Sequence, residues 1–346
     1  MRISTGYGLR VAVSSAALLA ISALSSAAQE KVNIYSAREP ALIDPLLKAF
    51  TAKTGIQVNS VFLTAGLTER VAAEGAQSPA DLIMTVDIAR LTEAKDAGVT
   101  QAVSLPSITE KVPAAYRDGD GHWFGLTMRS RVIYASKERV KQDAITYEEL
   151  ADPKWKGKIC TRSGQHAYNT ALVASMIAIK GEAFAETWLK GVKANLARKP
   201  AGGDREAVRD VQAGLCDLAI SNTYYMAAMI KNPEQKVWAE SVRMIFPNSA
   251  DRGSHINISG MALTKNAPNK VAALKLMEFL ASDEAQNIYA DVNNEYPINP
   301  KVPQSETVKS WGALKPDALP IVDISKHRKR ASELLDKVGF DQGPGT

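Results

Sequence analysis

The chain has 346 residues, of which 45% are hydrophobic and 23% are charged, a balance that excludes a disordered or fibrous protein. This length exceeds what one hydrophobic core usually organises, so we expect two lobes. The formal net charge of +5 is too small a surplus to indicate a nucleic-acid partner. Two cysteines and four scattered histidines argue against a disulfide framework and against a thiolate or histidine metal site.

The N-terminal segment 1–28 has the layout of a secretory signal peptide. A basic start with Arg2 and Arg10 precedes a mostly apolar run over 11–24, and small residues follow. The alternative is a membrane anchor, but a membrane span needs roughly 20 apolar residues and this run is shorter. We therefore expect the mature protein to work outside the cytoplasm, in the periplasm if the source is Gram-negative.

The two cysteines, Cys160 and Cys216, would lie in an oxidising compartment after secretion, which favours a single disulfide between them. The alternative is a pair of buried thiols. It stays open at this point, because the sequence does not give the distance between the two sulfur atoms.

The first hundred residues of the mature chain alternate strands and helices. Their apolar patterns predict the following order: strand 32–35, helix 41–53, strand 58–62, helix 67–74, strand 81–85 and helix 88–97. This order argues for an open parallel sheet with helices on both faces. Ligands of such sheets bind beyond the carboxyl ends of the strands.

A long extended stretch over 123–136 leads into a second α/β region. The later predicted elements are helices 170–179, 182–192 and 205–214, strands 217–221, 242–246 and 256–263, and helices 271–280, 283–292 and 327–338. The sequence contains no long linker, so we expect the chain to cross between lobes within secondary structure, at 123–136 and 254–263. We interpret the basic run 326–330 as a solvated helix face.

Enzyme signatures are mostly absent from the sequence. It contains no glycine-rich nucleotide motif, no nucleophile elbow and no HExxH zinc motif, and its serines and histidines form no recognisable triad. We therefore expect a binding protein and not an enzyme.

The most distinctive local feature is the adjacent pair Tyr224 and Tyr225. It follows the predicted strand 217–221 at a strand-to-helix turn, where a cleft ligand would lie. Adjacent side chains point to opposite faces in a regular strand but can converge in a turn. Taken alone, the pair also fits a simpler interpretation, in which one tyrosine packs and the other caps a helix.

Several short segments together resemble the periplasmic ferric iron-binding proteins of bacterial ABC importers, also called bacterial transferrins. Their order and spacing, spread over most of the mature chain, make the resemblance specific. The segments are VNIYSAR (32–38), SPADLIMTVD (78–87), RSRVIY (129–134), WKGKIC (155–160), RSGQHAYN (162–169), GLCD (214–217), the tyrosine pair, ISGMAL (258–263) and NEYPINP (294–300).

The resemblance implies a two-lobed α/β fold, in which each lobe is an open mixed sheet with flanking helices and two crossing strands form the hinge. The N-terminal lobe would comprise 29–128 and 255–303, and the C-terminal lobe 129–254 and 304–346. It implies a monomer that captures Fe³⁺ in the cleft between the lobes and delivers it to an ABC permease of the inner membrane. No chemistry is performed on the ligand.

Carried over residue by residue, the resemblance makes Tyr224 and Tyr225 iron ligands. Tyr168 falls where the tyrosine-rich branch of the family has a third phenolate. Other branches add a histidine with a glutamate, or a histidine–tyrosine pair, from the N-terminal lobe. This chain has Glu39 after the YSAR stretch and Val86 at the position aligned with the glutamate, so it resembles the tyrosine-rich branch, with Glu39 as a possible extra ligand.

In that branch an exogenous anion, often carbonate, completes the coordination sphere. Arg129 and Arg131 are the candidates for binding it, because side chains two residues apart in a strand face the same way. A guanidinium group suits a planar oxyanion. We favour Arg129, and the alternative is that either arginine only pairs with a carboxylate.

The charge of the proposed ligands favours Fe³⁺ over divalent ions. A phenol is protonated at neutral pH, with a pKa of about 10, and a trivalent ion can displace the proton. Three phenolates then balance three positive charges, whereas a divalent ion would leave a partly buried site anionic, which is unfavourable. The rival hypothesis is the same scaffold binding a small organic cation or an oxyanion, with the tyrosines as an aromatic clamp around a cation.

Overall fold

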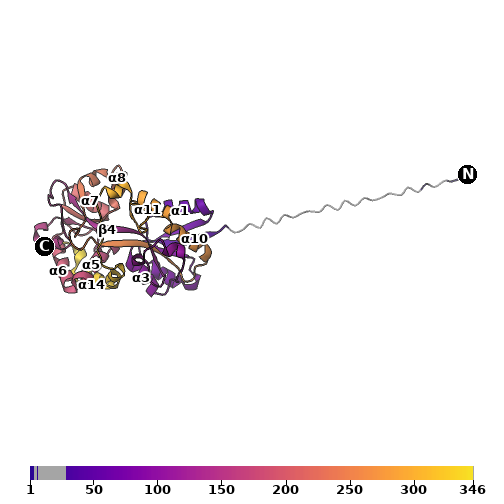
Figure 1. Cartoon of the computed structure of the whole chain (residues 1–346), viewed down its shortest axis with the longest axis horizontal. Helices are drawn as coiled ribbons and strands as arrows, with labels where there is room; N and C mark the ends of the chain where they lie inside the picture. Colours follow the sequence, from indigo (N-terminus) through magenta and orange to yellow (C-terminus); the bar gives the residue numbers. More distant parts are fainter. Residues whose placement is uncertain (4–5, 7–28, 346) are drawn as a thin grey trace.

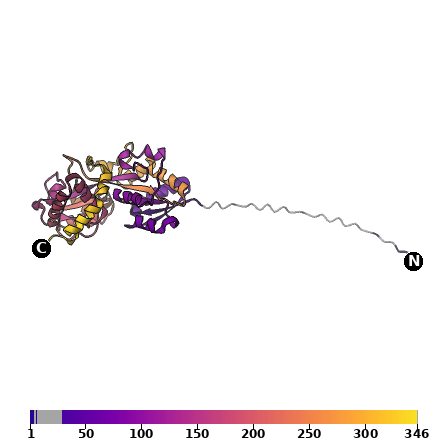
Figure 2. The same ribbon diagram turned by 90° about the horizontal axis from the view of Figure 1, so that it is seen from below.

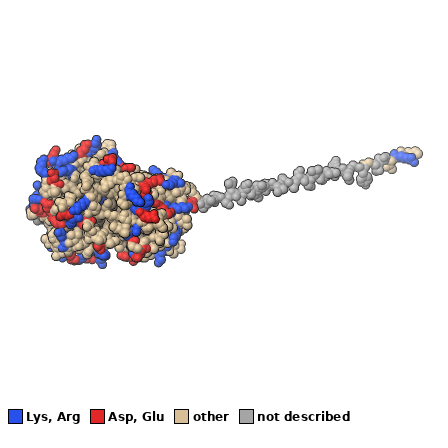
Figure 3. All heavy atoms as spheres, viewed as in Figure 1, with Lys and Arg blue, Asp and Glu red and all other residues tan. Residues whose placement is uncertain are grey.

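The computed structural model describes residues 1–3, 6 and 29–345. Residues 29–345 form two lobes placed end to end (Figure 1). Nearly all of the predicted signal peptide lies outside the described residues. Within the described part, no helix is long and apolar enough to cross a membrane. Basic and acidic side chains are interspersed over the face seen in Figure 3, in keeping with the small net charge.

The N-terminal lobe is built from alternating strands and helices, as predicted. Its first elements are β1 (Lys31–Ser36), α1 (Pro40–Thr54), β2 (Gln57–Phe62), α2 (Leu67–Glu74), β3 (Leu82–Thr85), α3 (Ile88–Asp96) and α4 (Pro106–Thr109). Strand β1 pairs in parallel with both β2 and β3. Apolar side chains from β1, β3, α1 and α3 are buried together in the core, which explains why short apolar runs form central strands here.

Strand β4 (Phe124–Ser136) runs through both lobes and is the axis of the molecule (Figure 1). Its first half, up to Ser130, pairs with β8 (Ile256–Leu263), which also pairs with β3. Its second half, from Arg131, pairs instead with β6 (Leu218–Asn222) and β7 (Val242–Ile245). The chain therefore crosses between lobes inside a continuous strand, as expected from the sequence.

The C-terminal lobe follows β4. Its elements include β5 (Ile159–Cys160), α5 (Ala167–Lys180), α6 (Glu182–Ala194), α7 (Asp204–Gln212), α8 (Tyr225–Lys231) and α9 (Lys236–Glu240), together with β6 and β7. Strand β6 is parallel to β5 and antiparallel to β4, so the sheet is mixed. The predicted start of α5 at residue 170 was wrong, because the helix begins three residues earlier, at Ala167.

The chain then returns to the first lobe with β8, α10 (Lys270–Ala281), α11 (Asp283–Asp291) and β9 (Tyr296–Pro297), which pairs with β4. The tail adds α12 (Glu306–Lys309), α13 (Ile321–Lys326) and α14 (Arg328–Val338). Helix α13 contacts both α3 and α5, and α14 packs on α5 and α6. Figure 2 shows the tail helices, in yellow, along the C-terminal lobe. We keep the predicted lobe boundaries as a proposal, which the change of partner along β4 supports.

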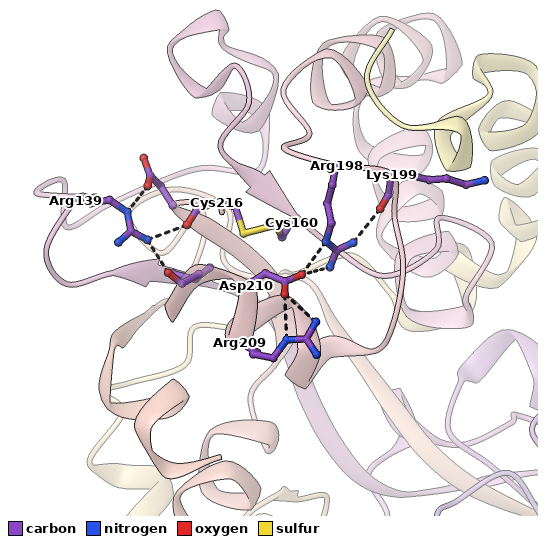
Figure 4. Close-up of a disulfide and its surroundings, with 9 residues drawn as sticks. Arg139, Cys160, Arg198, Lys199, Arg209, Asp210 and Cys216 are labelled. Atoms are coloured by element: carbon purple, nitrogen blue, oxygen red, sulfur yellow. Dashed lines mark hydrogen bonds and ion pairs between the residues drawn. A yellow bond between two sulfur atoms is a disulfide. The ribbon is translucent and has the colours of Figure 1, made fainter. Parts of the chain in front are cut away.

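The predicted disulfide between Cys160 and Cys216 is present, with a Cα–Cα distance of 5.9 Å (Figure 4). It joins β5 to the segment between α7 and β6. Both cysteines are buried. Arg139 reinforces this corner, since its guanidinium donates a hydrogen bond of 2.9 Å to the carbonyl oxygen of Cys216. The disulfide therefore fixes the start of the strand that carries the tyrosine pair at its other end.

Candidate metal centre

Three tyrosine side chains converge on the C-terminal side of the cleft. Tyr224 lies in the turn between β6 and α8, Tyr225 is the first residue of α8, and Tyr168 lies in the first turn of α5. The phenol oxygens of Tyr168 and Tyr224 are 3.0 Å apart, and the rings of Tyr224 and Tyr225 are 4.4 Å apart. All three side chains are buried. The two side chains of the pair therefore lie together where the strand gives way to the helix.

His166 orients Tyr168. It is the N-cap residue of α5, and its ring Nδ1 accepts a hydrogen bond of 3.3 Å from the backbone N–H of Tyr168. Its ring lies edge-on to the Tyr168 ring at 4.5 Å. Burial, helped by the nearby Arg162 guanidinium, lowers the pKa of His166 to about 3. His166 is half-buried, and the sequence alone did not indicate its role. The sequence signal that could have found it is its place just before an apolar helix.

Arg131 is held by a buried network within the C-terminal lobe. Its guanidinium forms an ion pair with Asp204 and donates to the side-chain oxygens of Asn169 and Asn222, at 2.8 and 3.1 Å. Burial alone would raise the pKa of Asp204, but the Arg131 and Arg162 guanidinium groups outweigh it and hold the pKa below its usual value. The charge of Arg131 is therefore already compensated.

Arg129 differs from Arg131 although both lie on β4. It is 2% exposed, and its Nη1 is 3.5 Å from the Ser259 hydroxyl. Among the described residues, none offers a hydrogen-bond acceptor to its Nη2, and His255 Nδ1 also lacks a partner there. Both arginines line one small cavity with Tyr168, Asn222, His255 and Asn257, with about 10 Å³ of room for the centre of a water molecule. Arg129 is thus the arginine with an unpaired terminal guanidinium donor, Nη2, among the described residues that line the cavity beside Tyr168.

The N-terminal lobe presents apolar side chains to the tyrosines. Leu42 from α1 and Val86 from the β3–α3 connection pack against the cluster. Val86 is the residue aligned with the glutamate of another branch. Glu39 is exposed at the start of α1.

Tyr224 and Tyr225 are protonated at neutral pH until something displaces their protons. Burial, together with the neighbouring phenols, raises the pKa of Tyr224 well above 10, and burial likewise raises that of Tyr225. A hard trivalent cation could displace these protons. Over residues 29–345, no group of three or more His, Cys, Asp or Glu side chains could hold a metal ion. The tyrosine cluster is therefore the candidate metal centre of the described chain.

Comparison with known proteins agrees with this architecture. Residues 77–316 match the family described as bacterial extracellular solute-binding protein. The chain belongs to this family. Iron uptake protein A1 of Synechocystis sp. is 42% identical to this solute-binding protein over 316 residues, which cover 90% of this chain and 88% of that protein.

Solved structures with the same fold bear out the resemblance to ferric iron-binding proteins. Apo ferric ion-binding protein A of Pasteurella haemolytica superposes with a TM-score of 0.88 at 45% identity, covering 90% of this chain and 98% of that one. A Trichodesmium protein solved with iron and citrate ligands has a TM-score of 0.83 at 42% identity, covering 90% and 99%. This solute-binding protein therefore has the two-lobed fold of periplasmic binding proteins, and its relatives are binding proteins and not enzymes.

Proposed function

We propose that this solute-binding protein captures Fe³⁺ in the periplasm and delivers it, as a monomer, to an ABC permease of the inner membrane. The ligands are the phenolates of Tyr168, Tyr224 and Tyr225. The observation that carries the proposal is the convergence of the three buried phenols on one side of the interlobe cleft. Relatives named for iron uptake and ferric binding support the choice of ion.

The chemistry of the phenols supports a trivalent cargo. Because burial raises the pKa of Tyr224 and Tyr225, each must lose a proton when it binds the ion. Three phenolates neutralise Fe³⁺, whereas a divalent ion would leave a net negative charge in a buried site. Reduction to Fe²⁺ would unbalance the site in the same way and promote release. Proton release on binding also means that the affinity for iron rises with pH.

Arg129 is the proposed contact for an exogenous anion, with carbonate as the first candidate. Its uncompensated guanidinium lines the cavity beside Tyr168. Arg131 faces the same cavity, but its pairing with Asp204 assigns it the role of shaping the cavity wall. Glu39 stays a proposed extra ligand, and Glu39→Gln would leave the iron site unchanged if Glu39 takes no part.

The test is a visible absorption titration of the iron-free protein with chelated Fe³⁺, with and without bicarbonate. Charge transfer from tyrosinate to iron should give a visible band that saturates at one iron per chain. Tyr224→Phe and Tyr225→Phe should lose it, whereas the control Tyr116→Phe, in the other lobe, should keep it. Arg129→Gln should lose the bicarbonate effect. Absence of a band in both buffers would contradict the proposal and favour an organic cation or an oxyanion as ligand.

A further inference from the structure

An ion pair joins the two lobes at some distance along the chain from the tyrosines. Arg328, the first residue of α14, donates from Nη1 to the carboxylate of Asp87 at 2.9 Å, and its Nε lies 3.1 Å from Glu93. Helix α14 packs on α5 and α6 of the C-terminal lobe, whereas Asp87 and Glu93 belong to the start and middle of α3 in the N-terminal lobe. In Figure 1, α3 and α14 lie on the same side of β4.

Asp87 connects this ion pair to the tyrosine cluster. It directly follows Val86, which packs against the tyrosines. Its second carboxylate oxygen accepts a hydrogen bond of 2.7 Å from the side-chain amide of Asn257. Asn257 lines the cavity that also contains Arg129 and Tyr168. A displacement of Asp87 would therefore move Val86, on the N-terminal side of the cleft, and Asn257, in the cavity wall.

The placement of the proposed ligands makes such a connection necessary. All three tyrosines belong to the C-terminal lobe, and the facing side chains Leu42 and Val86 are apolar. A metal ion held by ligands of one lobe does not itself tie the other lobe down. Closure over the ion must then depend on contacts between the lobes. Among the contacts between the described residues of the two lobes, that of Arg328 has the strongest electrostatic character, because its guanidinium faces two carboxylates, those of Asp87 and Glu93.

We propose that Arg328 is a positioning residue that holds the cleft closed over the ion and so sets the rate of its release. This inference rests on the proposed function. A second contact between the lobes lies between α8 and the end of α11, where Lys231 Nζ donates a hydrogen bond of 3.0 Å to the carbonyl oxygen of Val292. That contact has a neutral acceptor and is exposed, so it is the weaker of the two.

The ion pair is built to open again. Asp87 is the N-cap of α3, and its carboxylate also accepts from the backbone N–H groups of Ala89 and Arg90. When Arg328 withdraws, these donors, the helix N-terminus and Asn257 still stabilise the carboxylate. Arg328 is already partly exposed and gains hydration on opening. Separation of the lobes therefore leaves neither Asp87 nor Arg328 as a buried charge without a partner. The contact slows opening without preventing it.

The experiment compares Arg328→Gln with Arg330→Gln. Arg330 lies on the same helix, and its ion-pair partners among residues 29–345 are Glu182 and Glu333 of its own lobe, so it is the matched control. With iron bound, Arg328→Gln should release it to a competing chelator roughly three- to tenfold faster, as expected for loss of a partly exposed ion pair. The wavelength of the visible band should not change, because the ligands are intact. Added salt should accelerate release from the wild type more than from the variant.

A second measurement needs no iron and separates this inference from the proposed function. Small-angle X-ray scattering of the metal-free proteins should give a larger radius of gyration for Arg328→Gln than for the wild type and Arg330→Gln. If the wild type binds no iron, the proposed function fails and scattering alone decides the role of Arg328. Scattering profiles that coincide for all three proteins would overturn the inference, as would equal release rates.

Discussion

The two faces of the cleft differ in chemistry and in how they are held. The C-terminal face carries all three tyrosines, with a buried ion pair, a histidine cap and a disulfide fixing the segments that bear them. The N-terminal face offers Leu42 and Val86 and, behind them, the α3 carboxylate that meets Arg328. The difference suggests a division of labour, in which one face would recognise the ion and the other would cover it.

The largest expected effect tests how firmly the C-terminal face, which carries the three tyrosines, is held in place. Asp204→Asn should lower the free energy of unfolding by about 3–5 kcal/mol, because it leaves the Arg131 guanidinium buried without a counter-charge. Urea denaturation of the metal-free protein measures this. Asp217→Asn is the control, since Asp217 pairs with the more exposed Arg139 and Lys158, and it should lower stability by about 1 kcal/mol or less. Equal losses in the two variants would show that Asp204 does not organise this face.

The disulfide should come next. Replacing both Cys160 and Cys216 with alanine should lower the free energy of unfolding by about 2–4 kcal/mol, because the unfolded chain regains the freedom that the cross-link removes. Reduction of the wild type should reproduce the loss. The same denaturation experiment checks both. If the loss falls on the N-terminal lobe alone, as judged by hydrogen exchange, the disulfide does not stabilise the face that carries the tyrosines.

His255, in the cavity between the two faces, predicts a pH dependence. Burial, and next the positive charge of Arg129, lowers its pKa to about 3. Below about pH 6.5 the unfolded chain therefore binds a proton that the folded chain does not, and stability falls as the pH falls toward 3, by about 1.4 kcal/mol per pH unit. In metal-free His255→Gln the loss of stability between pH 6 and 4 should be shallower by that amount. Identical slopes would mean that His255 protonates in the folded protein.

The smallest expected effect concerns the N-terminal face, which presents Leu42 and Val86 to the tyrosines. Val86→Ala removes two carbons of a partly buried side chain that packs against the tyrosines. It should speed iron release by about two- to fivefold, which is less than the loss of two fully buried methylene groups would give. The overall stability should change little. Val61→Ala, at an exposed position of the same lobe, is the control. Slower release from Val86→Ala would mean that this face hinders closure instead of completing it.

Local patterns predicted most of the fold and the place of Tyr224 and Tyr225 after a strand, because strand periodicity and the turn after β6 depend on neighbouring residues. Tyr168 was added to the pair only by the family resemblance. The roles of the arginines needed the structure. Arg129 and Arg131 share one face of one strand, and what separates them is Asp204, which is 73 residues from Arg131 in the sequence. The solvated face predicted for the basic run 326–330 was wrong for Arg328, because its partner Asp87 lies 241 residues earlier. His166 was missed because its ring replaces the more usual Ser or Asp cap.

The position of β8 bears on how the chain can be exported. This strand lies between β3 and β4, so the sheet of the first lobe has a vacant central place until residue 263 has been synthesised. Pairing β3 with its neighbour closes a loop of well over a hundred residues, and contacts of such long sequence separation form slowly. Strands β1 to β3 thus leave the ribosome long before the sheet to which they belong can be completed. For a chain of a family that works outside the cytoplasm this delay is an advantage, because an incompletely folded chain threads through a translocation channel more readily than a folded one.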